Sequence, residues 1–346
     1  MNQFKRYYVT AHTASGFVNY LESNIKNVKK VIVLDHPSYK LKTDIFKRAT
    51  TYFNEIKTID ILCHSLSTSY LEGIIFGNSL AIVSEEIVSN LTNKHTISLS
   101  IGEELNKNTN ALHAAHRQYR ELASEAYTYF SKGLNIHDEL ENVYIKEMDF
   151  EKADDLANTF TQNLLQSVKG IERESYVYHR LFGTNTSDGV VNELPSLIEG
   201  VEHRVFVKGR AGTGKSVFMK KVMNACQQKG FDIEFYHCSF DPNSVDMIMV
   251  PELNFCIFDS TPPHEFFPNR KEDVVIDLYE KTVTPGTDEK FATEISRLTN
   301  QYKAEMKEGI EKLKIAGTIV KKEEEAWTKG LDFSNVWKLF LKQASL

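Results

Sequence analysis

The chain of 346 residues lacks several features that would place it in a familiar class. Basic residues are not in excess, since 41 Lys and Arg face 47 Asp and Glu, and a net charge of −6 disfavours nucleic acid as a partner. The four cysteines are scattered without C-x-x-C spacing, which argues against a disulfide scaffold. No segment reaches the roughly 18 consecutive apolar residues that span a bilayer, and residues 1–16 lack the apolar core of a secretion signal. We therefore expect a cytoplasmic protein that does not enter a membrane.

The chain does have the composition of a folded protein, with 41% hydrophobic and 25% charged residues, and it contains an internal repeat. Residues 11–28 and 184–201, which lie 173 positions apart, are identical at eight of eighteen positions without a gap. A single domain rarely exceeds about 250 to 300 residues, so the repeat predicts a tandem duplication into two domains. We place the copies at 1–170 and 171–346, with a linker around 167–175.

Each copy ends in a long segment with the pattern of an amphipathic helix. Between positions 288 and 329, apolar residues recur every three or four positions. The first copy has an equivalent stripe 183 positions earlier, and identities at this spacing include Gln118/Gln301 and Glu141/Glu324. We expect a helical arm in each copy, with the apolar stripes packed against other helices rather than forming a binding groove.

Short apolar runs alternate with a helical pattern before each arm, which predicts an α/β fold. In the second copy the runs at 205–207, 233–239 and 255–258 indicate strands, and 217–229 has helical spacing. Only one strand is expected between this helix and the strand that ends at Phe258. We predict two three-layer α/β domains, each with a long helical arm.

The segment Gly209–Ser216, GRAGTGKS, follows the first of these strands and precedes the helix. It matches G-x-x-x-x-G-K-[ST], the P-loop pattern, in which glycines let backbone N–H groups cradle phosphates beside a helix N-terminus. Lys215 would bridge the β- and γ-phosphates of a nucleoside triphosphate, and the Ser216 hydroxyl would coordinate Mg²⁺. The residues expected to contact the nucleotide are Gly209, Arg210, Ala211, Gly212, Thr213, Gly214, Lys215, Ser216 and Val217. The motif makes the expected fold two tandem P-loop NTPase-like domains, and the alternative is a glycine-rich turn that only connects strand to helix.

A second acidic element follows the apolar run at 255–258. Asp259 stands where a Walker B aspartate would hold Mg²⁺ directly or through water, whereas an aspartate that caps a turn is the alternative. The next residue is Ser260 instead of the glutamate that follows in many P-loop ATPases, so we expect slow hydrolysis. In the first copy the equivalent of this aspartate falls on Ser84, Glu85 or Glu86.

Residues near these motifs are candidates for chemistry. His264, in the loop STPPHEFFPNR after Asp259, is expected to sense the γ-phosphate or to act as an acid or base, the alternative being a histidine that caps the loop. Glu265 is a poorer candidate. Asp241 and Asp246 would lie beside the phosphates and orient an acceptor, although a helix cap or a Pro-containing turn also explains such residues.

The first copy has lost the phosphate cradle. His36, Tyr39 and Leu41 stand where the second copy has its three glycines, and their side chains would obstruct the approach of phosphate to the backbone. Lys42 and Thr43 persist at the lysine and serine positions, which supports descent from an active loop. We therefore expect one nucleotide site in the chain.

Several stretches resemble an uncharacterised family of bacterial tandem P-loop ATPases found largely in Gram-positive bacteria. The resemblance covers both copies and depends on KGRAGTGKS, YHCSFDPNSVDMIMVPEL, FDSTPPHEFFP, LYEKTVTPGTDEKFA and, in the first copy, HDELENVYIKEMDF. It implies an ATP site at Gly209–Ser216 with Asp259 and the following loop nearby, and it implies no known substrate. Many relatives keep a glycine-rich loop in the first copy, and this chain departs from them there.

The leading hypothesis is an enzyme that requires ATP and Mg²⁺. It would hydrolyse ATP slowly or transfer phosphate like a kinase, with Lys215, Asp259 and His264 as catalytic residues, Ser216 and Asp259 on the metal, and a regulatory first copy. The alternative is a switch, in which ATP closes the two copies and the arms present a surface to a protein partner without significant turnover. The acceptor, a small molecule if there is one, and the preference for ATP over GTP are left open.

Overall fold

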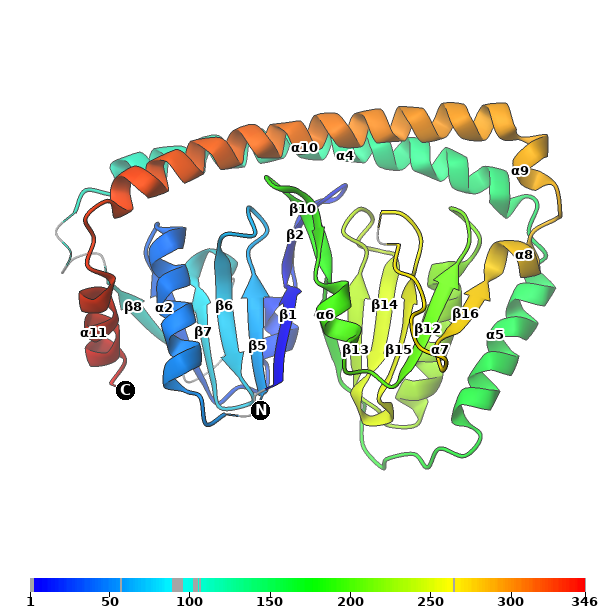
Figure 1. Ribbon diagram of the computed structural model, residues 1–346, viewed down its shortest axis with the longest axis horizontal. Coiled ribbons are helices and arrows are strands. Elements are labelled where there is room, and N and C mark those ends of the chain that lie inside the picture. The colour runs from blue at the N-terminus through cyan, green and yellow to red at the C-terminus, as the bar shows by residue number, and fades with distance from the viewer. Residues whose placement is uncertain are drawn as a thin grey trace.

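The computed structural model describes residues 3–56, 58–88, 96–101, 105, 107–263 and 265–345, and each half of the chain forms a mixed β-sheet (Figure 1). The sheet of the first half has the strand order β1-β5-β6-β7-β4-β8. Its strands are β1 (Gln3–Tyr8), β5 (Thr58–Cys63), β6 (Leu71–Phe76), β7 (Leu80–Ser84), β4 (Lys30–Asp35) and β8 (Thr96–Ser100). Strand β6 is antiparallel to both of its neighbours, and the other neighbouring strands are parallel.

The second half repeats this arrangement. Its sheet has the order β9-β13-β14-β15-β12-β16, and β14 is the strand that is antiparallel to both neighbours. The strands are β9 (Val177–Arg180), β13 (Ile233–His237), β14 (Val245–Val250), β15 (Phe255–Asp259), β12 (His203–Lys208) and β16 (Val274–Asp277). The α/β fold expected from the sequence is confirmed, and the matching strand orders agree with the tandem duplication.

Helices and hairpins complete each half, and each half has one hairpin and one short helix before its second helix. In the first half they are β2 (Thr10–Thr13), β3 (Gly16–Asn19), α1 (Leu21–Ile25), α2 (Tyr39–Tyr52) and the 3₁₀ turn η1 (Glu85–Ile87). In the second half they are β10 (Gly183–Thr186), β11 (Gly189–Asn192), α6 (Leu194–Ile198), α7 (Lys215–Gln228), η2 (Pro251–Leu253), α8 (Leu278–Thr282) and α9 (Thr287–Lys290). In the described part of the chain, no helix combines the length and the apolar character needed to cross a bilayer.

Strand β14 corrects one sequence expectation. Two strands, β13 and β14, separate α7 from β15 along the chain, whereas the apolar runs predicted one. The residues of β14 are all buried, but the turn signals before it and Asp246 within it hid the strand in the sequence. A buried aspartate in a central strand is uncommon unless it has partners.

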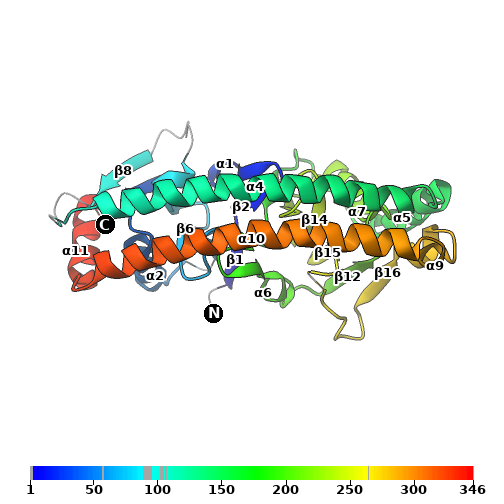
Figure 2. The same cartoon turned by 90° about the horizontal axis from the view of Figure 1, so that it is seen from above.

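The arms are α4 (Asn110–Ile145) and α10 (Ala292–Thr328), which lie side by side and antiparallel across both sheets (Figure 1, Figure 2). Their apolar stripes pack together, as expected. The helices that follow the arms are exchanged. Helix α5 (Phe150–Leu165) packs on α7, where the Phe160 and Phe218 rings are 5.5 Å apart. Helix α11 (Phe333–Ala344) packs on α2, where the Tyr52 and Trp337 rings are 5.7 Å apart.

The two halves share one hydrophobic core. It joins one face of the first sheet, through Val31 and Val83, to one face of the second sheet, through Phe206 and Phe258. Residues of α1 and α6 belong to the same core. The opposite faces are covered by α2 with α11 in the first half and by α7 with α5 in the second. Each sheet is therefore buried on both sides.

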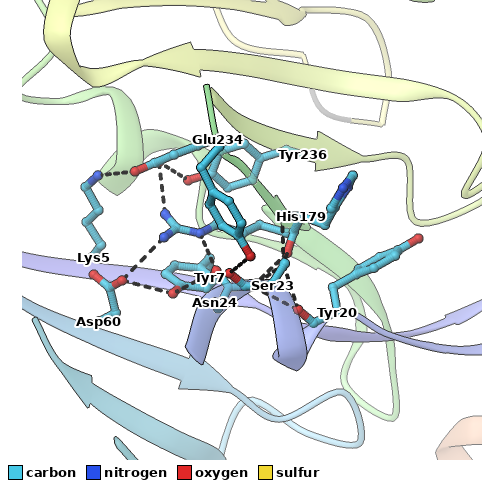
Figure 3. A network of polar contacts seen from close by, with 11 residues as sticks. Lys5, Tyr7, Tyr20, Ser23, Asn24, Asp60, His179, Glu234 and Tyr236 are labelled. Carbon is cyan, nitrogen blue, oxygen red and sulfur yellow. Dashed lines mark hydrogen bonds and ion pairs between the residues drawn. The ribbon is translucent and has the colours of Figure 1, made fainter. Parts of the chain in front are cut away.

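A buried polar network also joins the halves (Figure 3). The Arg180 guanidinium of β9 lies 4.1 Å from the centre of the Tyr7 ring and pairs with Glu234 at 3.0 Å and Asp60 at 3.5 Å. Lys5 of β1 pairs with the same Glu234 at 2.6 Å. Burial raises the pKa of Glu234, but the ion pairs with Arg180 and Lys5 outweigh this effect and lower the pKa to about 2. These charges tie the edge strands of the two sheets to one another.

Candidate functional site

The glycine-rich loop of the second half lies at the carboxyl end of β12 and leads into α7. Gly209, Gly212 and Gly214 have φ values of 155°, 72° and 81°, a region in which a side chain is strained. A Cβ on Gly209 would also lie 2.4 Å from the hydroxyl oxygen of Thr213. The loop thus needs its glycines, and it ends at a helix N-terminus, where the helix dipole favours an anion. Val217, in the first turn of α7, has an exposed side chain.

Lys215 and Asp259 come together at this loop. Strand β12 lies between β15 and β16 and is parallel to both. The Lys215 ammonium lies 3.6 Å from the Asp259 carboxylate and donates a hydrogen bond to the Arg210 carbonyl at 2.8 Å. The Ser216 hydroxyl accepts a hydrogen bond from the N–H of Val245, the first residue of β14, at 3.1 Å. The predicted lysine, serine and aspartate therefore gather at one end of the second sheet.

The other predicted residues have different surroundings. His264 lies outside the described residues. The carboxylate of Glu265 pairs with Lys208 at 3.0 Å, so it has a local partner. Asp241 accepts a hydrogen bond from the Ser244 hydroxyl at 2.8 Å within the turn before β14. These contacts place Asp241 in a turn, which was the alternative interpretation from the sequence.

Asp246 is a buried acid beside Asp259. Burial raises its pKa to about 7, and the nearby charge of Asp259 contributes in the same direction. This carboxyl group therefore changes its charge near neutral pH.

The end of α4 forms one wall of the loop, although α4 belongs to the first half. A Cβ on Gly212 would lie 2.5 Å from the Glu141 carbonyl oxygen, so the two backbones are in close contact. The Gly212 N–H stabilises the charged form of the Glu141 carboxylate and so lowers its pKa. His137 Nδ1 lies 3.7 Å from this carboxylate, and burial, together with the charge of Lys215, lowers the pKa of His137. The loop motif gave no indication that α4 contributes to this site. The sequence signal for it was that the repeat has identical residues at Glu141 and Glu324.

A cavity of about 230 Å³ borders the loop. Its walls come from both arms, from α9 and from the loop, and they consist of Leu140, Tyr144, Arg210, Ala211, Asp288, Ile295 and Thr299. The Asp288 carboxylate accepts hydrogen bonds at 2.9 Å from the Tyr144 hydroxyl and from the Arg210 guanidinium. Polar groups that already pair with one another thus line the space next to the loop.

The equivalent loop of the first half is helical. Helix α2 begins at Tyr39, three residues before the position at which α7 begins in the repeat, and Ser38 caps it. The buried Lys42 donates hydrogen bonds to Ser84 at 2.7 Å and to Glu86 at 2.5 Å. The registers of β4 with β7 and of β12 with β15 assign Ser84 to the position of the second-half aspartate. A helical turn thus stands where the second half has its glycine-rich loop.

Comparison of the chain with models of protein families, with curated proteins and with solved structures found no match in any of the three. The function is therefore argued from the geometry of the loop and of the residues around it.

Proposed function

We propose that residues 209–216 bind ATP as its Mg²⁺ complex and that the protein is a P-loop ATPase or phosphotransferase of slow turnover with a regulatory first half. The observation that carries the proposal is the loop between β12 and α7. Its left-handed glycines are followed by Lys215, whose ammonium lies 3.6 Å from Asp259. Backbone N–H groups at a helix N-terminus together with a lysine are the groups that phosphate requires.

The oxygen donors beside the loop fit Mg²⁺. The Ser216 hydroxyl and the Asp259 carboxylate are hard ligands, and Asp246 adds a carboxyl group with a pKa of about 7. Among the described residues, no cluster of three His, Cys, Asp or Glu side chains is arranged to hold a metal. Mg²⁺ commonly binds to one or two carboxylates together with phosphate oxygens, so the ion would enter with the nucleotide. It would neutralise charge on the phosphates.

Slow turnover follows from the residues next to Asp259. Phosphoryl transfer depends mainly on positioning and on charge neutralisation, which Lys215 would supply. No glutamate follows Asp259, and the hydroxyl of Ser260 donates to the carbonyl of Phe266 within the same loop. His264 retains the role proposed from the sequence, a sensor of the γ-phosphate or an acid or base.

A second candidate function is a nucleotide-dependent switch without significant turnover. The contact between Gly212 and Glu141 favours it, because a nucleotide in the loop would act directly on α4. The arms would then present a surface to a protein partner. Phosphate release at steady state distinguishes the two functions, since a switch would bind ATP and change shape but release almost no phosphate.

Calorimetry with Mg·ATP tests the binding that both functions need. Lys215→Ala should remove most of the affinity, while Lys221→Ala is the matched control, because Lys221 lies on the same helix and pairs with Asp154. Asp259→Asn should instead reduce the dependence of binding on Mg²⁺. A wild-type protein that binds neither ATP nor GTP, or a Lys215→Ala variant with unchanged affinity, would overturn the proposal.

A further inference from the structure

The carboxylate of Glu141 lies in the glycine-rich loop. The Gly212 N–H stabilises the charged form of this carboxylate and so lowers its pKa, and the backbone of α4 is in contact with the loop at the same point. N–H groups of such a loop, beside the N-terminus of a helix, form an anion site. Glu141 therefore lies next to the position in which the phosphates of the proposed nucleotide would lie.

The same contact occurs in the first half. Glu324 of α10, the equivalent of Glu141 in the repeat, accepts hydrogen bonds from the N–H groups of Tyr39 at 2.5 Å and Lys40 at 3.3 Å. It also accepts one from the Ser38 hydroxyl at 2.6 Å. Tyr39 is the equivalent of the glycine that Glu141 contacts. Each arm thus places one glutamate at the loop position of the other half.

The two glutamates differ in how firmly they are held. Glu324 is fully buried, and its donors belong to the first turn of a helix and its cap. Lys42, which stands in the first half at the position of Lys215, is paired with Glu86. Glu141 is partly exposed, and the nearby Lys215 pairs with Asp259 at the longer distance of 3.6 Å. Glu324 is thus held more firmly than Glu141.

The charges around Glu141 also make exchange easy. Burial raises the pKa of Glu141, and the carboxylates of Asp138 and Asp241 act in the same direction, whereas Lys215 and the Gly212 backbone lower the pKa. The net shift is upward, so the surroundings disfavour the charged form of Glu141.

We propose that Glu141 is an internal ligand that occupies the phosphate position of the loop, and that a nucleoside triphosphate displaces it on binding. The inference rests on the proposed function, because it names the regulation of the same site. Displacement of Glu141 releases the end of α4 from Gly212, and α4 is continuous to the first half, where it packs along α10. Nucleotide binding in one half is thereby coupled to the helical arms that both halves share.

The test compares the affinity of Mg·ATP for the wild type, Glu141→Ala and Glu141→Gln by calorimetry. Removal of the competing carboxylate should tighten binding by about tenfold or more for alanine, and by less for glutamine, which can still accept the hydrogen bond. Glu324→Gln is the matched control, since it removes the equivalent charge from the other half and should leave the affinity unchanged. Melting temperatures establish that each variant is folded.

Hydrogen exchange gives a second measurement. ATP should increase amide exchange at the end of α4, around residues 133–148, in the wild type, and Glu141→Ala should show the increase without nucleotide. Unchanged or weaker affinity of folded Glu141→Ala would overturn the inference, as would a loss of turnover at unchanged affinity, which would place Glu141 in the reaction instead. If neither the wild type nor the variants bind nucleotide, the proposed function fails as well.

Discussion

Tyr8 and Leu181, which stand 173 residues apart at equivalent positions of the repeat, pair with each other. The N–H of each residue donates to the carbonyl of the other at 2.9 Å, in an isolated antiparallel bridge. Two equivalent residues can make such reciprocal contacts when they lie at a twofold axis. The two halves are therefore related by a pseudo-twofold axis that passes close to this pair.

Other contacts follow the same relation. The side chain of Asn185 donates to the carbonyl of His12, its equivalent in the repeat, at 3.2 Å. Helix α1 packs on β9 while α6 packs on β1, and the helices after the arms are exchanged. One chain thus has the kind of self-complementary interface that relates two subunits of a homodimer. Each loop receives the arm of the other half as a result of this symmetry.

The first prediction is that one chain binds one nucleotide. Only the second half has a glycine-rich loop, while the first-half equivalent is the first turn of α2 with Lys42 buried against Glu86. Calorimetry should give a stoichiometry of one, and Lys215→Ala should reduce it to no measurable binding. A stoichiometry of two, with one site surviving in Lys215→Ala, would contradict the prediction and would place a ligand in the first half.

The loop and its lysine were predictable because they depend on local sequence. Eight consecutive residues define the motif, and the apolar run before Asp259 defines its strand. The repeat also predicted the arms, since a stripe of apolar residues is a local signal. What the sequence could not show was the exchange of α5 and α11, because either sheet could accept an apolar helix face of this kind.

The contacts of Glu141 and Asp246 were missed for the same reason. Glu141 is one acid among many on a charged helix, and only the position of the other half's loop gives it a role. Asp246 lies in a strand that its own turn signals concealed, and its pKa depends on burial and on Asp259, which is 13 positions away in sequence. Properties that depend on distant neighbours need the folded structure.

The second prediction concerns the pH dependence of stability. Burial raises the pKa of Asp246 to about 7 from its usual value of 3.8, so between these pH values the folded protein binds a proton that the unfolded chain does not. Stability contributed by this group is therefore present at low pH and is lost as pH rises through 7. Asp246→Asn lacks this loss and should exceed the wild type in unfolding free energy by about 1 to 3 kcal/mol at pH 8.

Urea denaturation at pH 5 and pH 8 measures the difference. The gap between Asp246→Asn and the wild type should widen with pH, and Asp259→Asn should show part of the same effect, because it removes a neighbouring charge that raises the pKa of Asp246. Two stability curves that stay parallel from pH 5 to pH 8 would show that Asp246 is charged in the folded protein throughout this range.

The third prediction concerns the buried network between the halves. Arg180→Met keeps the apolar stem but, among the residues that the structure describes, leaves Glu234 and Asp60 with Lys5 as their nearby cation. Loss of one partner from a buried ion pair costs about 3 to 5 kcal/mol, and the variant should be destabilised by that amount at pH 7. Lys5→Met is the control, because Lys5 is more exposed and should cost less.

The effect of pH on this variant has a definite sign. In the wild type the lowered pKa of Glu234 means that its contribution is present above the usual carboxyl pKa of 4.5 and is lost as pH falls toward 2. Without Arg180, burial dominates and raises the pKa of Glu234. Protonation of Glu234 at acid pH then reduces the destabilisation of the variant. The difference in stability between the two proteins should therefore shrink from pH 7 to pH 4, and Glu234→Gln should rescue part of it in Arg180→Met.

The last prediction concerns the contact between the arms. Gly309 of α10 faces the fully buried ring of Phe130 in α4, and a Cβ on Gly309 would lie 2.4 Å from a ring carbon. Alanine favours a helix over glycine by about 1 kcal/mol, but overpacking of a core costs about 1 to 3 kcal/mol. Because the obstacle is a rigid ring, Gly309→Ala should lower the unfolding free energy measured in urea. Gly200→Ala is the control, since nothing lies within 4 Å of its added Cβ, and it should change stability by less than about 0.5 kcal/mol.

A double variant decides whether the ring is the cause. In a Phe130→Leu background the obstacle is smaller, so the same Gly309→Ala change should become neutral or stabilising through its helix propensity. The coupling free energy between the two positions should then exceed about 0.5 kcal/mol, the deviation from additivity that is usual for independent sites. If Gly309→Ala has the same effect with phenylalanine and with leucine at position 130, the two arms do not pack at this point as described.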